Sequence, residues 1–281
     1  MYTIEFAGIS DQGNVRFKNE DSIGHTDPEE LDVRRDRGSL FIIADGVGGH
    51  GAGDVASQTA VKVVTEQYYS MHGKPDKALS NALQRANLHV FDLGIETNKF
   101  RMQTTLSAIA FLGAAACIAH VGDTRIYRVR GPKAFEQLTR DDSEVGELVR
   151  MKIVAPENAR GHPRRSVITR SLGNETVLRP QSKVETVEVN DTFVLCTDGV
   201  WEPVLDEEIA EIAWGNEPEK ACKMLIDMAL ERKSKDNVSV QVIRVTQISD
   251  ELRKSHDSKL PWWKTIFSSN GARSGAGSEL G

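Results

Sequence analysis

The chain has 281 residues, 39% of them hydrophobic and 27% charged, with a formal net charge of −6 at pH 7. That length is sufficient for one large α/β domain or two small ones with a substantial buried core. The acidic balance provides no general attraction for nucleic acid, and the sequence has no run of about 18 apolar residues that could span a bilayer. We therefore expect neither a nucleic-acid partner nor a transmembrane segment.

Two further features bear on location. Residues 1–5 lack a basic region followed by an apolar stretch, so no secretory signal is expected. The three cysteines, Cys117, Cys196 and Cys222, have no metal-type spacing and are expected to be reduced core residues. Together these features predict a cytoplasmic protein, or at most one held at a membrane by another component.

Strand-like and helix-like patterns alternate along the first half of the chain. Residues 39–44 form an apolar run that ends in Asp-Gly-Val-Gly-Gly, which predicts a buried strand leading into a glycine-rich loop. Helical spacing of apolar residues predicts two successive helices, at 53–69 and 75–93. Three short strands joined by tight turns are then expected, at 104–111, 114–121 and 125–130.

The second half begins with an irregular segment. Residues 138–170 are charged and contain two prolines, and only 143–151 has a helical pattern, so we expect an excursion over the surface. Strands are then predicted at 184–189, 192–196 and 238–245, and helices at 206–214 and 217–231. Groups of strands interrupted by paired helices favour antiparallel sheets covered by helices over a parallel sheet.

The carboxyl-terminal region has the composition of a tail. We expect one domain over residues 1–246 and a polar, flexible tail over 247–281. Within the tail, residues 261–267 (Pro-Trp-Trp-Lys-Thr-Ile-Phe) form an apolar island that could dock on the domain, on a partner or on a membrane surface.

Acidic residues beside turn residues at predicted strand ends are the most informative feature of the sequence. They are Glu20, Asp21, Asp45, Asp123, Asp198 and Asp236. If these side chains converge, their mutual repulsion is tolerable only with divalent cations between them. Donors that are all oxygen favour Mg²⁺ or Mn²⁺ over zinc. An ordinary turn role is the alternative for any one of them.

Eight short motifs follow one another along the chain in an order that resembles a known protein family. The chain contains Asp11-x-Gly13-x-x-Arg16-x-x-Asn19-Glu20-Asp21, Asp45-Gly46-Val47-Gly48-Gly49-His50, Thr104-Thr105, Val121-Gly122-Asp123-Thr124-Arg125, Leu138-Thr139-x-Asp141-Asp142-Ser143, Ile168-Thr169-Arg170-Ser171-Leu172-Gly173, Cys196-Thr197-Asp198-Gly199-Val200-Trp201 and Asp236-Asn237-Val238-Ser239. Across residues 3–245 this series resembles the metal-dependent serine/threonine protein phosphatases of type 2C, and the Gly-Gly-His sequence resembles their bacterial branch.

The resemblance implies an α+β fold, a four-layer α-β-β-α sandwich of two antiparallel sheets flanked by helices. It also implies two core Mn²⁺ or Mg²⁺ ions at one end of the sandwich. Asp21, Asp198 and Asp236 would hold one ion, Asp45 would bridge both, and Glu20 and the Gly46 carbonyl would complete the second. Asp123 and Asp198 match a third-ion site of bacterial members.

The resemblance further implies a mechanism in which Arg16, Asp45 and Asp198 are catalytic and Arg16 binds the substrate phosphate. A hydroxide between the ions would attack phosphorus without a protein nucleophile. From the residues alone, Arg16 could instead form a surface ion pair with Glu20, and Asp123 could cap a hairpin. His50 could reach the site or be a core or helix-start residue.

Some positions depart from the family pattern. Val47 stands where many eukaryotic members have a histidine, which leaves the general acid unassigned. Gln103 and Asp142 replace a usual glycine and histidine, which affects loop geometry and substrate preference. The arginines within 138–170 could attract an acidic phosphopeptide or pair with neighbouring acidic residues: Arg160, Arg164, Arg165 and Arg170, next to His162.

We therefore predict a monomeric phosphatase that hydrolyses phosphoserine and phosphothreonine in proteins and reverses a bacterial serine/threonine kinase. One alternative is a catalytically weak pseudophosphatase that binds phosphoproteins, although it would be expected to have lost metal ligands. Another is a regulatory phosphatase acting on an anti-sigma-type protein, for which extra sensor or coiled-coil segments would be expected.

Overall fold

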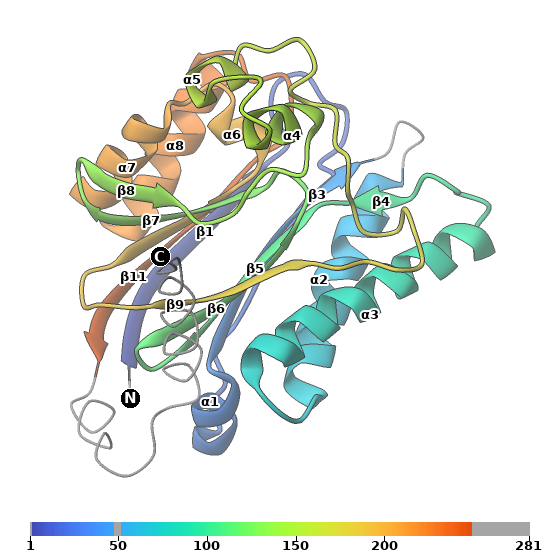
Figure 1. Ribbon diagram of the computed structural model, residues 1–281. Helices are drawn as coiled ribbons and strands as arrows, with labels where there is room; N and C mark the ends of the chain where they lie inside the picture. The colour runs from blue at the N-terminus through green and yellow to red at the C-terminus, as the bar shows by residue number, and fades with distance from the viewer. Residues whose placement is uncertain (1, 48–51, 249–281) are drawn as a thin grey trace, which may run out of the picture.

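Two antiparallel β-sheets form the centre of the molecule in the computed structural model, which describes residues 2–47 and 52–248 (Figure 1). The first sheet has the order β1 (Tyr2–Asp11), β11 (Val238–Ile248), β10 (Thr192–Cys196), β7 (Arg125–Gly131) and β8 (Ala134–Gln137). The second has the order β2 (Asp21–Thr26), β3 (Ser39–Val47), β5 (Leu106–Leu112), β6 (Ala115–Val121) and β9 (Gln181–Thr186), and β4 (Gln103–Thr104) pairs with β3. Neighbouring strands are antiparallel throughout both sheets.

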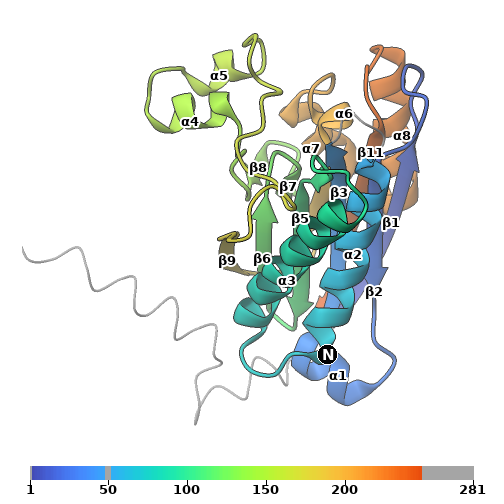
Figure 2. The same cartoon turned by 90° about the vertical axis from the view of Figure 1, so that its right-hand side faces the viewer.

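Helices cover the outer face of each sheet (Figures 1 and 2). The helices α2 (Gly53–Ser70) and α3 (Pro75–Glu96) pack on the second sheet, and α7 (Asp206–Gly215) and α8 (Pro218–Glu231) pack on the first. The short helix α1 (Leu31–Arg37) lies against β5 and α2. The predicted four-layer α-β-β-α sandwich is confirmed.

The layers follow from the two-residue period of the strands. On β3, Leu40 and Ile42 pack against α2 and α3, whereas Phe41 and Ile43 face the other sheet. Because successive side chains of a strand point to opposite faces, a strand buried on both faces is a continuous apolar run. This explains why the run at 39–44 was recognisable as a strand.

Aromatic rings fill the space between the two sheets. The Phe111 ring centroid lies 5.9 Å from that of Phe41 and 5.0 Å from that of Phe193, in edge-to-face arrangements. All three residues are at most 1% exposed. The sheets are therefore joined by a dry aromatic core.

Several predicted elements are wrong or missing. The strand predicted at 184–189 is β9, which ends at Thr186, because Asn190 has a left-handed φ of 73° and the Asp191 carboxylate accepts the Glu188 N–H in a turn. The sequence analysis missed β1, β2, β8, α1 and the short helices α5 (Pro156–Ala159) and α6 (Asp198–Trp201). The last strand, β11, continues to Ile248, beyond the predicted end of that strand at residue 245.

The segment 138–170, which we call the flap, lies beyond the end of the sheets and carries α4 (Glu144–Arg150) and α5 (Figure 2). The alternative in which its arginines pair with acidic neighbours is confirmed. Arg160 pairs with Asp206 at 2.6 Å, Arg164 with Glu144 at 2.9 Å, Arg165 with Glu202 at 3.0 Å and Arg170 with Asp142 at 3.5 Å.

Two other predictions, on the cysteines and on membrane-spanning helices, can be compared with the structure. Cys117, Cys196 and Cys222 are free and buried, as expected. Among the helices within 2–47 and 52–248, none combines the length and apolar character needed to cross a bilayer. His50 and the apolar island at 261–267 lie outside the described residues.

Candidate metal centre

Asp21 and Asp45 face one another across the β2–β3 pair, where their Cα atoms are register partners. Asp21 is buried, and its Oδ2 atom accepts hydrogen bonds from Thr197 Oγ1 at 2.9 Å and Ser239 Oγ at 2.6 Å. Thr197 follows β10 and Ser239 lies on β11, so both donors come from the other sheet. The carboxylate of Asp21 therefore lies where the two sheets meet.

Asp45 lies among the other acidic residues that the sequence singled out. Burial raises the pKa of its carboxyl well above the ordinary value, and the charges of Asp21, Asp198, Asp123 and Asp236 raise it further. Its backbone carbonyl accepts the Thr105 N–H and the Thr104 hydroxyl, each at 2.8 Å. The convergence of all six acidic residues on one ion site therefore stays a prediction, which the charges that raise the pKa of Asp45 support.

Glu20 and Gly46 lie beside this pair. The Glu20 carbonyl accepts the Gly46 N–H at 3.1 Å, and Glu20 Oε1 accepts the N–H of Gly53, the first residue of α2, at 3.2 Å. A Cβ atom on Gly46 would lie 2.2 Å from the Gly53 carbonyl oxygen and 2.6 Å from that of Glu20. Only glycine can therefore bring this backbone so close to Glu20.

Asp123 and Asp198 each have a carboxylate oxygen, Oδ1, that is buried without a hydrogen-bond partner among the described residues. Burial raises the pKa of Asp123 to about 7, and the charge of Asp141 contributes; burial and the charges of Asp123 and Asp236 raise the pKa of Asp198 well above its ordinary value. An unpaired buried carboxylate oxygen is costly unless a cation compensates it. These two oxygens therefore fit a metal-binding role.

Arg16 reaches Asp236, with 2.5 Å between Arg16 Nη2 and Asp236 Oδ2. The ion-pair partner of Arg16 is therefore Asp236, whereas the alternative from the sequence was a surface ion pair with Glu20. The Arg16 side chain is 48% exposed, which leaves it accessible to a substrate. Arg16, Asp198 and Asp236 line one cleft of about 580 Å³, together with residues of the flap and of the α8–β11 loop.

Sequence reasoning gave no role to Asn237, which organises the loop that carries Arg16 and Glu20. Its Nδ2 atom donates to the carbonyls of Gln12 and Lys18 at 2.8 and 2.9 Å, and its Oδ1 atom accepts the Glu20 N–H at 2.8 Å. The signal was present in the Asp-Asn motif, although such a dipeptide is also ordinary turn chemistry.

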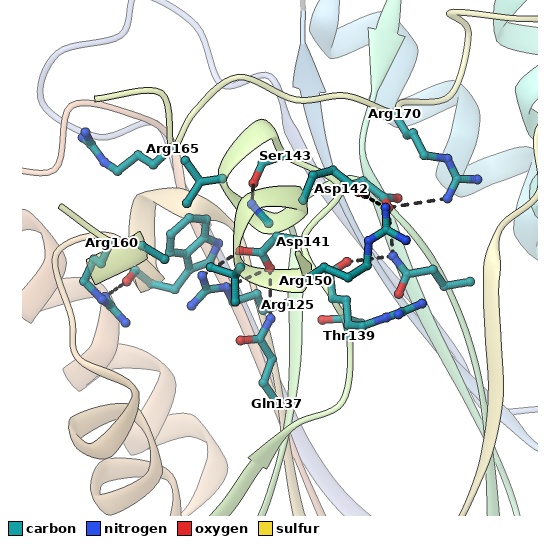
Figure 3. A pocket seen from close by; sticks show the side chains of 18 of the residues that line it. Arg125, Gln137, Thr139, Asp141, Asp142, Ser143, Arg150, Arg160, Arg165 and Arg170 are labelled. Carbon is teal, nitrogen blue, oxygen red and sulfur yellow. Dashed lines mark hydrogen bonds and ion pairs between the residues drawn. The ribbon is translucent and has the colours of Figure 1, made fainter. Parts of the chain in front are cut away.

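Trp201 is a second residue that the sequence analysis quoted only as part of a motif. Its indole N–H donates to the Asp123 carbonyl at 3.0 Å, and the guanidinium carbon of Arg125 lies 3.7 Å from the centre of its ring. Arg125 also binds Asp141 at 2.7 Å, in a pocket of about 560 Å³ beneath the flap (Figure 3). This contact series connects the base of the flap to Asp123.

The acidic side chains are neighbours without forming a closed cage. In the part of the chain that the structure describes, no three acidic, histidine or cysteine side chains are close enough to enclose an ion as they stand. The site nevertheless fits hard divalent cations. Its candidate ligands are oxygen atoms, which such ions require, and a bound cation would neutralise the repulsion between carboxylates whose pKa values are raised.

Comparison with known proteins finds protein phosphatases of bacteria among the relatives of this chain. The chain is 35% identical over 244 residues to the serine/threonine protein phosphatase PstP of Mycobacterium tuberculosis, a match that covers 86% of this chain and 45% of PstP. It is 29% identical over 249 residues to the protein phosphatase PhpP of Streptococcus pneumoniae, which covers 87% of this chain and 98% of PhpP. The chain thus spans about half the length of PstP.

Solved structures agree with these relatives. The crystal structure of PstP superposes with a TM-score of 0.78 at 32% identity, covering 88% of this chain and all of that one. A structure of the PstP catalytic domain in complex with two manganese ions superposes with a TM-score of 0.76 at 31% identity, with the same coverage of both chains. Residues 7–238 match the family model of protein phosphatase 2C, and the chain therefore belongs to the protein phosphatase 2C family.

Proposed function

We propose that this protein is a metal-dependent phosphatase that hydrolyses phosphoserine and phosphothreonine in proteins. The observation that carries the proposal is the group of carboxylates around Asp45, in which Asp123 and Asp198 have unpaired buried oxygens. Family membership and the two manganese ions of the PstP catalytic domain support it. A pseudophosphatase would be expected to have lost ligands, whereas the whole predicted acidic set is present.

The predicted ligand set is retained as part of the proposal. Asp21, Asp198 and Asp236 would hold one Mn²⁺ or Mg²⁺ ion, Asp45 would contribute to both ions, and Glu20 and the Gly46 carbonyl would complete the second. Asp123 and Asp198 would hold a third. Bound ions would supply Lewis acidity and lower the pKa of a coordinated water.

Side chains of the protein would hold the metal ligand Asp21 and the phosphate-binding residue Arg16 in position. Hydrogen bonds from Thr197 and Ser239 favour the ionised form of Asp21 against the burial that raises its pKa to about 7. Asn237 fixes the loop that carries Arg16. Arg16 would bind two phosphate oxygens through its planar guanidinium, which lysine cannot reproduce.

The direct test is hydrolysis of a generic aryl phosphate with and without added Mn²⁺. We expect activity with the ion and none in excess chelator, and we expect Asp198→Asn and Asp45→Asn to lower kcat by at least about 100-fold. Asp32→Asn, a change at a largely exposed residue of α1, is the matched control and should be neutral. Undiminished hydrolysis in chelator would reject the metal-dependent mechanism.

Three finer predictions accompany the proposal. The protein would reverse the action of a serine/threonine kinase, act as a monomer and be cytoplasmic. The bacterial serine/threonine phosphatases among its relatives support the first statement, and the three free cysteines support the third.

A further inference from the structure

The cleft that contains Arg16 has a second group of basic residues. Five basic and three acidic residues line it, although the whole chain has a net charge of −6. The basic residues are Arg16, Arg160, Arg165, Lys233 and Lys235, and the acidic ones are Asp198, Glu202 and Asp236. This cleft is therefore locally basic on an acidic protein.

Lys233 and Lys235 belong to the loop between α8 and β11, immediately before Asp236. Lys233 has a left-handed φ of 61°, and its N–H donates to the Leu230 carbonyl at 3.0 Å. The Ser234 N–H donates to the Ala229 carbonyl at 3.0 Å, and Ser234 is buried. These bonds close the end of α8 and fix the backbone from which both lysine side chains extend.

Two of the three acidic residues of the cleft already have basic partners, and the third belongs to the proposed metal site. Asp236 binds Arg16, Glu202 binds Arg165, and Asp198 belongs to the carboxylate group around Asp45. Within residues 2–47 and 52–248, no ion pair joins Lys233 or Lys235 to a carboxylate. Both lysines are exposed, so their charge is available to a ligand.

The flap forms another wall of this cleft. Arg160 is held by the Val204 carbonyl at 2.7 Å and by Asp206, and it also lines the pocket beneath the flap, where Figure 3 shows it with Arg165. Arg160 and Arg165 are thus tied to neighbouring acidic residues, whereas the two lysines are not. The lysines are the groups best placed to contact an additional anion.

We propose that Lys233 and Lys235 form a subsite for a second anionic group of the substrate, a phosphate or carboxylate a few residues from the phosphorylated residue that is hydrolysed. This inference rests on the proposed function, because Arg16 would hold the phosphate that is cleaved. In an extended peptide, alternate side chains point to the same side and lie about 7 Å apart. A substrate with two anions could contact both Arg16 and the lysines, because all three residues line the same cleft.

The experiment compares phosphothreonine peptides that differ only in a second group, placed two or four residues away on either side. The second group is phosphothreonine, glutamate or glutamine. We expect kcat/KM to be higher for the peptides with phosphothreonine or glutamate as the second group than for the peptide with glutamine. The Lys233→Gln, Lys235→Gln double variant should lower this ratio of kcat/KM values about five- to tenfold. The preference should also decline as salt is added.

Lys152→Gln is the matched control. Lys152 is also an exposed lysine with a left-handed φ, 59°, and it lines neither cleft. This variant should keep the wild-type preference. A preference for phosphothreonine without one for glutamate would identify a phosphate subsite, and an equal preference would identify a general anion subsite.

Aryl phosphate hydrolysis separates this inference from the proposed function. The wild type and the double lysine variant should hydrolyse the aryl phosphate equally, because it has no second anion. No hydrolysis by the wild type with Mn²⁺ would refute the proposed function itself. Hydrolysis without any preference among the peptides, or a preference that survives in the double lysine variant, would refute the subsite alone.

Discussion

Asn237 shows how one side chain can arrange the loop that carries Arg16. It is 3% exposed and holds the carbonyls of Gln12 and Lys18 and the N–H of Glu20. The loop between β1 and β2 has no regular structure of its own over residues 15–20, so these bonds replace the backbone pairing that a strand would provide. The position of Arg16 therefore depends on a residue more than two hundred positions away.

The raised pKa of Asp123 predicts how the metal-free protein responds to pH. An aspartate carboxyl ordinarily has a pKa of 3.8, and burial raises the pKa of Asp123 to about 7 in the folded protein, so between about pH 4 and 7 the unfolded chain loses a proton that the folded chain keeps. The free energy of unfolding therefore falls as pH rises through this window. Asp123 would contribute up to roughly 4 kcal/mol of that fall.

Urea unfolding in chelator from pH 4.5 to 8 would measure this slope, with Asp123→Asn as the comparison. The amide cannot ionise, so the variant should lose less stability than the wild type as pH rises. Subtraction of the two curves removes the titration of groups that do not interact with Asp123. Parallel curves would show that Asp123 ionises in the folded state without a penalty.

At the scale of elements, the flap is joined to the site through Asp142. Its N–H donates to the Gly122 carbonyl at 2.7 Å, its Oδ2 accepts the Gly122 N–H at 3.2 Å, and its carbonyl accepts the Thr169 N–H at 2.7 Å. Both ends of the flap are thus tied to the turn that precedes Asp123. Figure 3 shows the carboxylate of Asp142 near Arg170, which lies on the returning segment.

We expect Asp142→Ala to lower the free energy of unfolding by about 1–3 kcal/mol, because it leaves the buried Gly122 N–H without an acceptor. It should also raise the Mn²⁺ concentration for half-maximal activity, since the turn before Asp123 is loosened. Asp142→Asn retains an acceptor oxygen and should recover most of both losses. An alanine variant with wild-type metal titration and stability would contradict this role.

The elements differ in how far the sequence could predict them. The strands β3 and β10 are buried on both faces and appear as continuous apolar runs, and α2, α3 and α8 have clear helical spacing. The strand β2 reads Asp-Ser-Ile-Gly-His-Thr and has little apolar pattern, because its backbone is fixed by pairing with β3. Such pairing depends on another segment of the chain and leaves no local signal.

The same distinction holds within the site. The acidic residues of the site could be identified because they stand in ordered motifs with known spacing. Thr197 and Ser239 were not assigned a role, since they support Asp21 across sequence separations of 176 and 218 residues. Hydrogen bonds between hydroxyl and carboxylate groups at such separations become visible only when the sheets are packed together.

At the scale of the whole molecule, the aromatic core between the sheets keeps the two halves of the site together. Phe111 is 1% exposed and contacts Phe41 and Phe193. Phe111→Ala should lower the free energy of unfolding by about 3–5 kcal/mol, because it removes a buried ring and leaves a cavity. Phe100→Ala, at a residue that is 71% exposed, should change it by less than about 0.5 kcal/mol.

Chemical denaturation of both variants would check this expectation. Equal stability of the two would mean that the sheets are joined mainly by other contacts.

Asp21 belongs to one sheet while its hydroxyl donors belong to the other, and β11 lies between β1 and β10 as the last strand of the described chain. During synthesis, Asp21 and Asp45 would leave the ribosome long before Thr197, Asp198 and Asp236. In a nascent chain, Asp21 would therefore lack its two hydroxyl donors until Thr197 and Ser239 had been synthesised. The proposed activity would therefore be acquired in one step, when β11 is inserted between β1 and β10.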